Sequence, residues 1–181
     1  MRIFFTADMH FNHANVIDFC KRPFTSVEEM NERLIENWNS VVTKKDCVYV
    51  LGDVAWRNPH DLIKRLNGKK ILIRGNHDNF GLTKALRYGF SEVHEMHKIK
   101  IDGNNITMCH YPMHSWYKSH KGTYHIHGHI HEKIIPFMHN RYNVGVDVND
   151  YTPVSYEELM DIFKNQKLSC NTQHEEESDG C

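Results

Sequence analysis

The sequence contains no long apolar run. No stretch of its 181 residues approaches the roughly 18–20 consecutive apolar residues that a membrane-spanning helix requires. The N-terminal residues lead straight into a strand-like segment, with too few apolar residues for the central region of a signal peptide. We therefore predict a protein that has no membrane segment and is located in the cytoplasm.

Paired cysteines and an excess of positive charge are also missing. The five cysteines are irregularly spaced and include no C-x-x-C pair, so they indicate neither a disulfide framework nor a zinc knuckle. The 22 basic residues nearly balance the 23 acidic ones, for a net charge of −1. A protein that coats nucleic acid would carry a strong basic stripe, so long nucleic acid is not expected as a partner.

The first half of the chain alternates between strand-like and helix-like segments. Short apolar runs bounded by turn residues are typical of strands buried on both faces. They occupy residues 2–7, 47–51 and 70–74. Between them, Ser26 and Glu29 form a capping-box pattern that opens a helix, and Asn58-Pro59 opens another that ends near Gly68. This alternation predicts a parallel sheet covered by helices.

From about Val93 the pattern changes to short strands separated by turns. The strand-like segments are residues 99–101, 106–109, 124–126 and 142–146. We expect them to form a second sheet of hairpin-like strands. A further capping box from Ser155 to Glu158 opens a last helix, whereas residues 166–181 lack apolar periodicity. The chain is thus predicted to be one domain over residues 1–165 with a disordered acidic tail over residues 166–181.

Histidine is unusually abundant, and much of it falls where strands end. The 15 histidines, many beside Gly, Asn or Asp, are more than packing alone requires. In an open α/β sheet the ligand site lies beyond the carboxyl ends of the strands. The side chains at such ends are Asp8 and His10, then Asp53, then Asn76 and His77, with His110 and the run His127 to His131 in the second half. The fold should therefore gather these clusters in one crevice.

This mixture of ligand types suits a pair of metal ions. Two divalent cations roughly 3.5–4 Å apart can bind a phosphate, lower the pKa of a bridging water and stabilise the attacking and leaving oxygens. A carboxylate can bridge them, while neutral imidazoles and an amide oxygen complete each shell without making the site too anionic. Nitrogen and oxygen ligands favour Mn²⁺, with Fe or Zn²⁺ as alternatives, over Mg²⁺ and Ca²⁺. We predict two divalent metal ions.

The same clusters, in order, resemble the five motif blocks of the calcineurin-like metallophosphoesterase family. The blocks are Asp8-x-His10, Gly52-Asp53, Gly75-Asn76-His77-Asp78, His110 and Gly128-His129-x-His131, within residues 3–147. The resemblance implies an α/β fold, a four-layer α/β/β/α metallophosphoesterase sandwich of two mixed β-sheets flanked by helices. The run His10 to Asn15, with Arg22-Pro23-Phe24, is similar to a compact bacterial and phage branch of the family.

The resemblance also implies a role for each site residue. Asp8, His10 and His131 would hold the first metal, Asn76, His110 and His129 the second, and Asp53 would bridge them. His77 would donate a proton to the leaving group and would be oriented by Asp78. The predicted activity is phosphoester hydrolysis by a hydroxide that the two metals activate. The expected substrate is a small phosphoester or nucleotide, and a diester is favoured because Arg57 is the one obvious cation near the blocks.

Other functions on the same fold stay open. One is a phosphomonoesterase with the same site. Another is a non-catalytic metal-binding scaffold, which the loss of His77 or of several ligands would mark, although this sequence keeps all of them. A DNA nuclease would usually bring extra domains or a basic groove, and the sequence shows neither.

Several residues near the blocks have two interpretations each. His13 and Arg57 could bind the substrate phosphate or be solvated residues at helix starts, and His127 could touch substrate or make a structural hydrogen bond. Tyr111, Trp116 and Tyr117 could form an aromatic wall for a nucleobase, although core packing is the stronger expectation.

Overall fold

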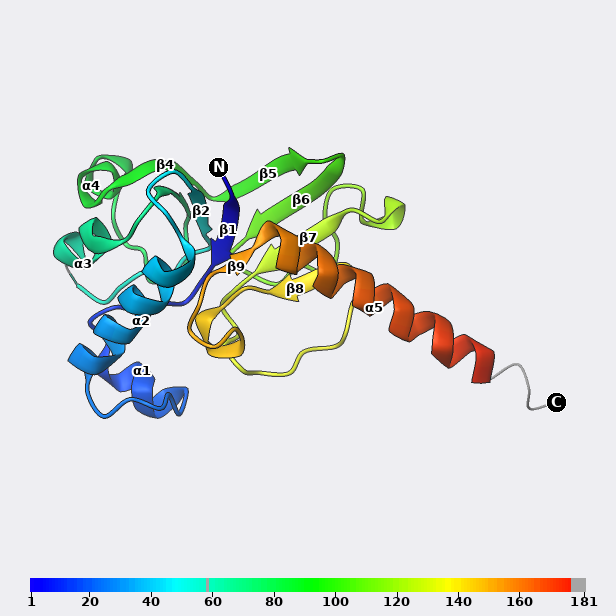
Figure 1. Cartoon of the computed structure of the whole chain (residues 1–181), viewed down its shortest axis with the longest axis horizontal. Coiled ribbons are helices and arrows are strands. Elements are labelled where there is room, and N and C mark those ends of the chain that lie inside the picture. The colour runs from blue at the N-terminus through cyan, green and yellow to red at the C-terminus, as the bar shows by residue number, and fades with distance from the viewer. Residues whose placement is uncertain (58, 177–181) are drawn as a thin grey trace.

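The computed structural model has a first sheet of five strands, in the order β4-β3-β2-β1-β9 (Figure 1). These strands are β1 (Ile3–Thr6), β2 (Cys47–Val50), β3 (Lys69–Ile73), β4 (Phe90–His94) and β9 (Val154–Ser155). The three strands predicted in the first half of the sequence form its middle as β1, β2 and β3, while β4 and β9 were not predicted. The strands β1 to β4 are parallel, and β9 pairs antiparallel with β1. The structure describes residues 1–57 and 59–176.

Four helices cover one face of this sheet. They are α1 (Ala14–Phe19), α2 (Val27–Val41), α3 (His60–Arg65) and α4 (Leu82–Tyr88). Ser26 caps α2 by accepting the Glu29 N–H, as predicted, while the Glu29 carboxylate accepts the N–H of Thr25. The predicted cap of α3, Asn58, lies outside the described residues, and Pro59 directly precedes that helix. Buried residues of α2, such as Leu34 and Trp38, share a core with this sheet face.

The second sheet has the order β5-β6-β7-β8. Its strands are β5 (Met96–Ile101), β6 (Asn104–Cys109), β7 (Tyr124–His127) and β8 (Arg141–Asn143). The hairpin prediction is right for β5 and β6 but wrong for the other pairs, because β6–β7 and β7–β8 are parallel. Parallel neighbours need crossover connections of about a dozen residues, and the segments 110–123 and 128–140 are long enough to supply them.

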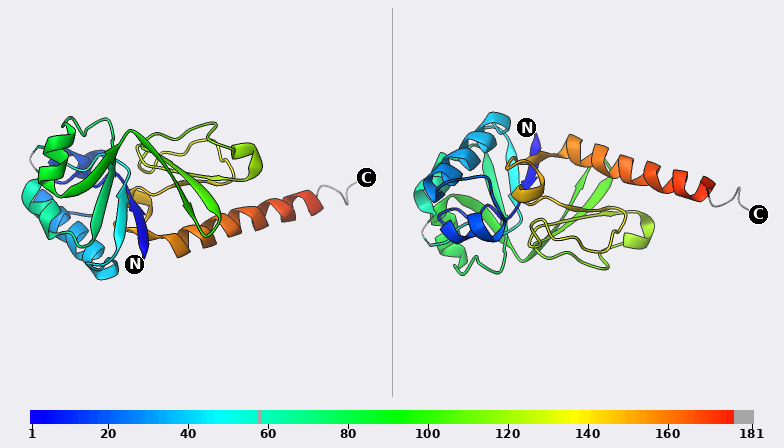
Figure 2. Two further views of the ribbon diagram at one scale, coloured as in Figure 1. Left: turned by 90° about the horizontal axis from the view of Figure 1, so that it is seen from above. Right: turned by 90° about the horizontal axis from the view of Figure 1, so that it is seen from below.

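A second core lies between the sheets. Alternate residues of the strands point into it, including Phe5 and Ile71 from the first sheet and Met108 and Ile126 from the second. The two sheets diverge away from this core, as the views from above and below show (Figure 2). Two mixed sheets flanked by helices confirm the expected fold class. Within the described residues, no helix is apolar enough over a sufficient length to span a membrane.

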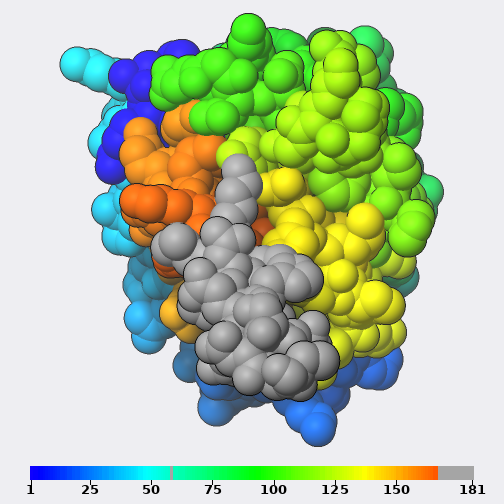
Figure 3. Space-filling view, turned by 90° about the vertical axis from the view of Figure 1, so that its right-hand side faces the viewer, coloured from blue at the N-terminus to red at the C-terminus, as the bar shows by residue number. Residues whose placement is uncertain are grey.

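Helix α5 (Tyr156–Glu176) packs into the core between the sheets. Ser155 and Glu158 form the predicted capping box, with each side chain accepting the other residue's N–H. Phe163 is fully buried and stacks on Tyr124 of β7, with ring centroids 4.5 Å apart. Figure 3 shows the molecule from the right-hand side of Figure 1. In this view the described part of α5 (orange) lies next to both the N-terminal strand (blue) and the second sheet.

Helix α5 runs beyond residue 165, the predicted end of the folded domain. It continues through Glu176, whereas residues 177–181 of the predicted tail lie outside the described residues. Leu, Lys, Gln and Glu have high helix propensity, so a helix can extend from a packed first half without an apolar stripe of its own. The boundary between domain and tail stays a prediction.

Candidate metal centre

Loops from both sheets meet at the carboxyl ends of the strands. Backbone hydrogen bonds tie the loops after β1 and β2 together, because Asp8 donates to Gly52 O and His10 donates to Asp53 O, each at 3.0 Å. The loops after β6 and β7 are joined in the same way by Gly128 N–H and His110 O, also at 3.0 Å. The structure thus brings together the motif blocks that the sequence singled out.

Many of the predicted ligands have a left-handed backbone conformation, with a positive φ angle. Their φ angles are 57° for Asp8, 51° for His10, 52° for Asp53, 73° for His129 and 51° for His131. Asp and His enter this region more readily than most residues, but each still costs on the order of 1–3 kcal/mol. Such conformations persist only where the surrounding structure enforces them, and they concentrate at functional sites.

Two glycines of the motif blocks allow the loops that carry the ligands to pack closely against one another. A Cβ atom at Gly128 would lie 2.5 Å from both the Ala7 side chain and Asp8 Oδ2. At Gly52, which has a φ of +87°, a Cβ would lie 2.7 Å from His110 Nδ1. The glycines of these two blocks are therefore required by the packing of the ligands around them.

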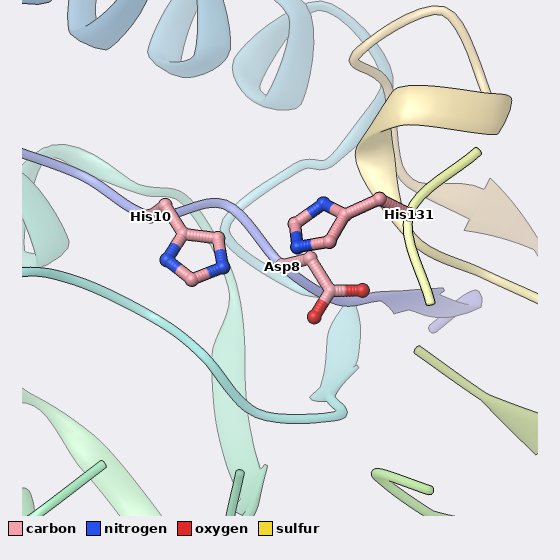
Figure 4. A group of neighbouring side chains, drawn as sticks. All are labelled: Asp8, His10 and His131. Atoms are coloured by element: carbon pink, nitrogen blue, oxygen red, sulfur yellow. The ribbon is translucent and has the colours of Figure 1, made fainter. Parts of the chain in front are cut away.

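Asp8, His10 and His131 form the first group of candidate ligands. Their side chains face one another, two from the loop after β1 and one from the loop after β7 (Figure 4). The donor atoms lie within 4.8 Å of one another, close enough to share a metal ion. Asp8 Oδ1 and His10 Nε2 are buried and have no hydrogen-bond partner among the described residues. Orphaned buried polar atoms are rare, and a divalent cation here would be the missing partner of both.

The electrostatics of this group also fit a cation. Burial raises the pKa of the Asp8 carboxyl to about 8 and lowers the pKa of the His10 imidazole to about 2. A buried carboxylate is costly without a counter-charge, whereas a neutral imidazole is the form that binds metals. A divalent cation would favour the ionised Asp8 beside the neutral His10.

The second group of candidate ligands lies on the side of the second sheet. Asn76 Oδ1 is 3.0 Å from His110 Nε2 and 3.0 Å from His129 Nδ1. Asp53 Oδ2 lies between the two groups, 3.6 Å from His10 Nε2 and 3.5 Å from His110 Nε2. All seven predicted ligands are therefore gathered in one place, with Asp53 in the position that a bridging carboxylate requires.

His77 lies beside this centre, whereas Asp78 has a different role from the one expected. The ring of His77 is 39% exposed, and its Nε2 is 3.9 Å from Asp53 Oδ2. We expected Asp78 to orient this ring, but its buried carboxylate instead accepts the backbone N–H groups of Asp53, Val54 and Gly75. Asp78 therefore fixes the loops after β2 and β3. His77 is held by its own N–H, which donates to Asp53 Oδ1.

Sequence comparison assigns the chain to a family. A profile of the calcineurin-like phosphoesterase superfamily domain matches residues 1–145. This chain belongs to that superfamily. It is therefore, in general terms, a metal-dependent phosphoester hydrolase. The family resemblance of the motif blocks is confirmed, while the roles of the individual residues stay predictions.

The phosphoesterase has relatives of similar length in other organisms. The uncharacterized protein MJ1445 of Methanocaldococcus jannaschii is 37% identical over 178 residues, which cover 92% of this chain and 94% of the relative. The Gene 66 protein of Mycobacterium phage L5 is 28% identical over 207 residues, which cover 96% of each chain. The crystal structure of AQ665 from Aquifex aeolicus, a protein of unknown function, has a TM-score of 0.72 and 26% identity, and the match covers 89% of this chain and 98% of that one.

A buried ion pair supports the first ligand group of the phosphoesterase, and the sequence did not reveal it. Arg22 donates to Asp147 through Nε at 2.7 Å and Nη2 at 2.9 Å, and both side chains are fully buried. Arg22 also donates to the backbone oxygens of Asp8 and Met9, while Asp147 Oδ2 is 2.7 Å from His131 Nδ1. Asp147 thus fixes the ring of His131 and leaves its Nε2 for the metal centre.

The pKa of His131 reflects this support. Burial would lower it, but the hydrogen bond to Asp147 and nearby negative charges raise it to about 10. The sequence offered one signal for this support, the carboxylate of Asp147 soon after β8. Asp147 is not among the predicted site residues.

Among the residues with two interpretations, the contacts of His127 favour a structural hydrogen bond over contact with substrate. It is buried, its Nδ1 is 2.9 Å from Gly128 O, and burial lowers its pKa to about 4. Trp116 is also buried and packs on His125, as the core interpretation predicts. By contrast, Tyr111 is 46% exposed with its ring edge-on to His129 at 4.7 Å. Tyr117 is exposed beside Lys118.

His13 and Arg57 border a cavity beside the site. His13 Nδ1 lies 3.4 Å from His10 Nδ1, and the His13 ring is 6.5 Å from the ring of His77. Arg57 is exposed and lines the same cavity of about 560 Å³. Both side chains could therefore meet a substrate that is bound at the metal centre.

Proposed function

We propose that the chain is a dinuclear metal-dependent phosphodiesterase that acts on small phosphodiesters. The observation that carries the proposal is the pair of orphaned buried atoms, Asp8 Oδ1 and His10 Nε2, directed into the same site. Together with Asp53 between two ligand groups, they indicate positions for two cations rather than one.

Each side chain has a defined part in this proposal. Asp8, His10 and His131 would hold the first ion, Asn76, His110 and His129 would hold the second, and Asp53 would bind both. Two divalent ions, with Mn²⁺ as the first choice, would polarise the phosphoryl group and activate a water. The buried ligands keep the site rigid, because their loops are tied to one another by backbone hydrogen bonds.

His77 supplies the proton that the leaving oxygen needs. As the bond between phosphorus and the leaving oxygen breaks, that oxygen takes a proton from the imidazolium of His77 and departs as an alcohol. Its partly exposed ring can reach the substrate while its backbone remains anchored to Asp53. A proton donor of this kind typically contributes about 10²–10⁴ in rate, and it matters most for a poor alkoxide leaving group.

The shape around His77 supports a diester. Two cavities, of about 560 Å³ and about 450 Å³, are both lined by His13 and His77. The first extends toward Trp56 and Arg57, the second toward Lys21 and Lys133. A phosphate at the metal centre would have room for an ester arm on either side, which a monoester does not use.

The distribution of cations bears on the same choice. A monoester brings close to two negative charges and needs more cationic side chains than a diester. Besides Arg57, the structure places the exposed Lys21 and Lys133 at the site, residues that the sequence did not single out, with Glu132 beside them. Arg22 is occupied by Asp147. Because both lysines are exposed to solvent and Glu132 lies beside them, their charge is partly offset, and a diester remains the favoured substrate.

The test compares kcat/KM for bis-p-nitrophenyl phosphate and p-nitrophenyl phosphate in one Mn²⁺ buffer. We expect a higher kcat/KM for the diester. A clear preference for the monoester would make the protein a phosphatase, and the absence of turnover with either ester would overturn the proposed enzyme. Lys133→Gln is the informative variant, because a monoesterase that depends on this charge would lose activity on p-nitrophenyl phosphate selectively.

A further inference from the structure

Trp56 is an exposed aromatic residue on a fixed backbone next to the metal centre. Its side chain is 44% exposed, although tryptophan is ordinarily highly buried. Its backbone N–H donates to Phe11 O at 2.7 Å, and Ala55 pairs with Phe11 in a parallel bridge. The loop that carries Trp56 is thus tied to the loop that carries His10, which fixes the backbone of Trp56 relative to the site.

The indole is also held in a defined orientation. It stacks on His13, with ring centroids 4.8 Å apart and planes inclined by 14°. His13 in turn contacts His10. One side of the indole is therefore occupied by an imidazole that belongs to the site, and the exposed remainder borders the cavity of about 560 Å³. Phe19, which is 75% exposed, lines the same cavity.

The position of Trp56 relative to His77 tells which part of a substrate it would meet. The two rings are 6.1 Å apart. Because His77 is proposed to protonate the leaving oxygen, a group attached to that oxygen can reach the cavity that Trp56 lines. This step rests on the proposed function.

We propose that Trp56, which stacks on His13 and lines the cavity together with Phe19, forms a subsite for a planar leaving group, so that the substrate is a nucleotide phosphodiester whose base stacks on Trp56. Every nucleobase has a π face, and stacking on an aromatic side chain is tolerant of sequence. Arg57 adds a positive charge to the same cavity and has no carboxylate within ion-pair distance among the described residues. It can therefore contact a further phosphate or stack on the base.

Two ligands that differ only in the base separate this subsite from the metal centre. AMP and ribose 5-phosphate carry the same phosphate, and each can be measured as a competitive inhibitor of bis-p-nitrophenyl phosphate hydrolysis with Mn²⁺ present. We expect a markedly lower inhibition constant for AMP. In Trp56→Ala the constant for AMP should rise roughly 5- to 150-fold, the equivalent of about 1–3 kcal/mol of stacking, while that for ribose 5-phosphate stays within twofold.

Conservative and remote variants complete the design. Trp56→Phe keeps an aromatic face and should recover most of the affinity for AMP. Tyr117→Ala removes an aromatic residue of similar exposure (48%) outside the cavity and should change neither inhibition constant. Equal constants for AMP and ribose 5-phosphate in the unaltered protein, or an equal rise of both in Trp56→Ala, would overturn the subsite.

A binding measurement separates failure of the subsite from failure of the proposed function. Trp38 and Trp116 are buried, at 1% and 7% exposure, so a stacked base should mainly quench Trp56. We expect saturable quenching of fluorescence by AMP and none by ribose 5-phosphate, with loss of the AMP signal in Trp56→Phe. If the protein hydrolysed no ester but AMP still quenched, the enzyme proposal would fail and the subsite would stand. If the protein hydrolysed the diester normally but AMP did not quench, the subsite would fail and the enzyme proposal would stand.

Discussion

Asp53 and His77 are neighbours with different proposed roles, and substitutions can separate them. Asp53→Asn removes a charge that lies close to both ligand groups, so we expect reduced metal content. His77→Asn should keep both metals and lower kcat for the diester by about 10²–10⁴, since only the proton donor is lost. Metal content and kcat measured on the same preparations decide the matter. His120→Asn, an exposed histidine outside the motif blocks, is the control. Metal loss in His77→Asn would show that this residue is a ligand.

Asp147 acts through His131, and its loss should be visible in metal affinity. Asp147→Asn weakens the acceptor of the His131 N–H, which typically costs about 10- to 100-fold in metal affinity. It also leaves Arg22 without its buried partner, which should lower the free energy of unfolding by about 3–5 kcal/mol. Both quantities can be measured, by chelator competition and by denaturant titration.

A matched control separates positioning from general stability in that experiment. Asp46 is likewise a buried carboxylate paired with an arginine, Arg2, but it precedes β2 at the opposite end of the strand from the ligands. Asp46→Asn should lower stability and leave metal affinity unchanged. If Asp147→Asn behaved in the same way, the contact with His131 would be structural only.

Sequence could predict only those site residues that lie just after a strand. Asp8, Asp53 and Asn76 follow apolar runs directly, and the ends of parallel strands necessarily meet at one edge of a sheet. The Arg22–Asp147 pair could not be predicted in this way, because it joins positions 125 residues apart and neither residue directly follows a strand of the first sheet. Trp56 was missed for another reason, since its exposure depends on tertiary packing.

The two halves of helix α5 are expected to contribute differently to the free energy of unfolding. Phe163 and Leu159 are fully buried in the core between the sheets. Phe163→Ala should lower the free energy of unfolding by about 3–5 kcal/mol. Deletion of residues 168–181 should change it by less than about 1 kcal/mol and leave kcat for bis-p-nitrophenyl phosphate unchanged, because this part of the sequence has no apolar periodicity and carries four acids near its end. A larger loss on deletion would show that the end of α5 docks on the body.

Element direction was harder to predict than element position. The four strand segments predicted in the second half overlap β5 to β8, although β4 and β9 were not predicted. Their direction was not readable, because the apolar pattern of a strand is the same whether its neighbour is parallel or antiparallel. The connections hold the missing information, since a short turn at Asp102-Gly103 permits only a hairpin, whereas residues 110–123 permit a crossover. The parallel arrangement has a consequence for the site, because it brings His110 and the run that ends at His131 to the same edge of the sheet.

The metal centre joins the two sheets of the whole molecule. Asp8, Asp53 and Asn76 come from the first sheet, whereas His110 and His129 come from the second. Bound ions would therefore link both sheets, and a ligand that binds only the folded state stabilises it by about 2.7 kcal/mol at a hundredfold excess over its Kd. Removal of metal by a chelator should lower Tm, and restoring Mn²⁺ should recover it. Asp53→Asn should show a much smaller shift than the unaltered protein.

Asp53 lies between the two ligand groups, so the number and position of bound ions decide whether one chain holds two metals around it. Protein purified without chelators would be analysed for transition metals, and the ions would be placed by anomalous scattering in crystals. We expect two ions per chain, both in contact with the Asp53 carboxylate, one bound also by His10 and the other by His110. A single ion, or ions bound away from Asp53, would rule out a dinuclear site.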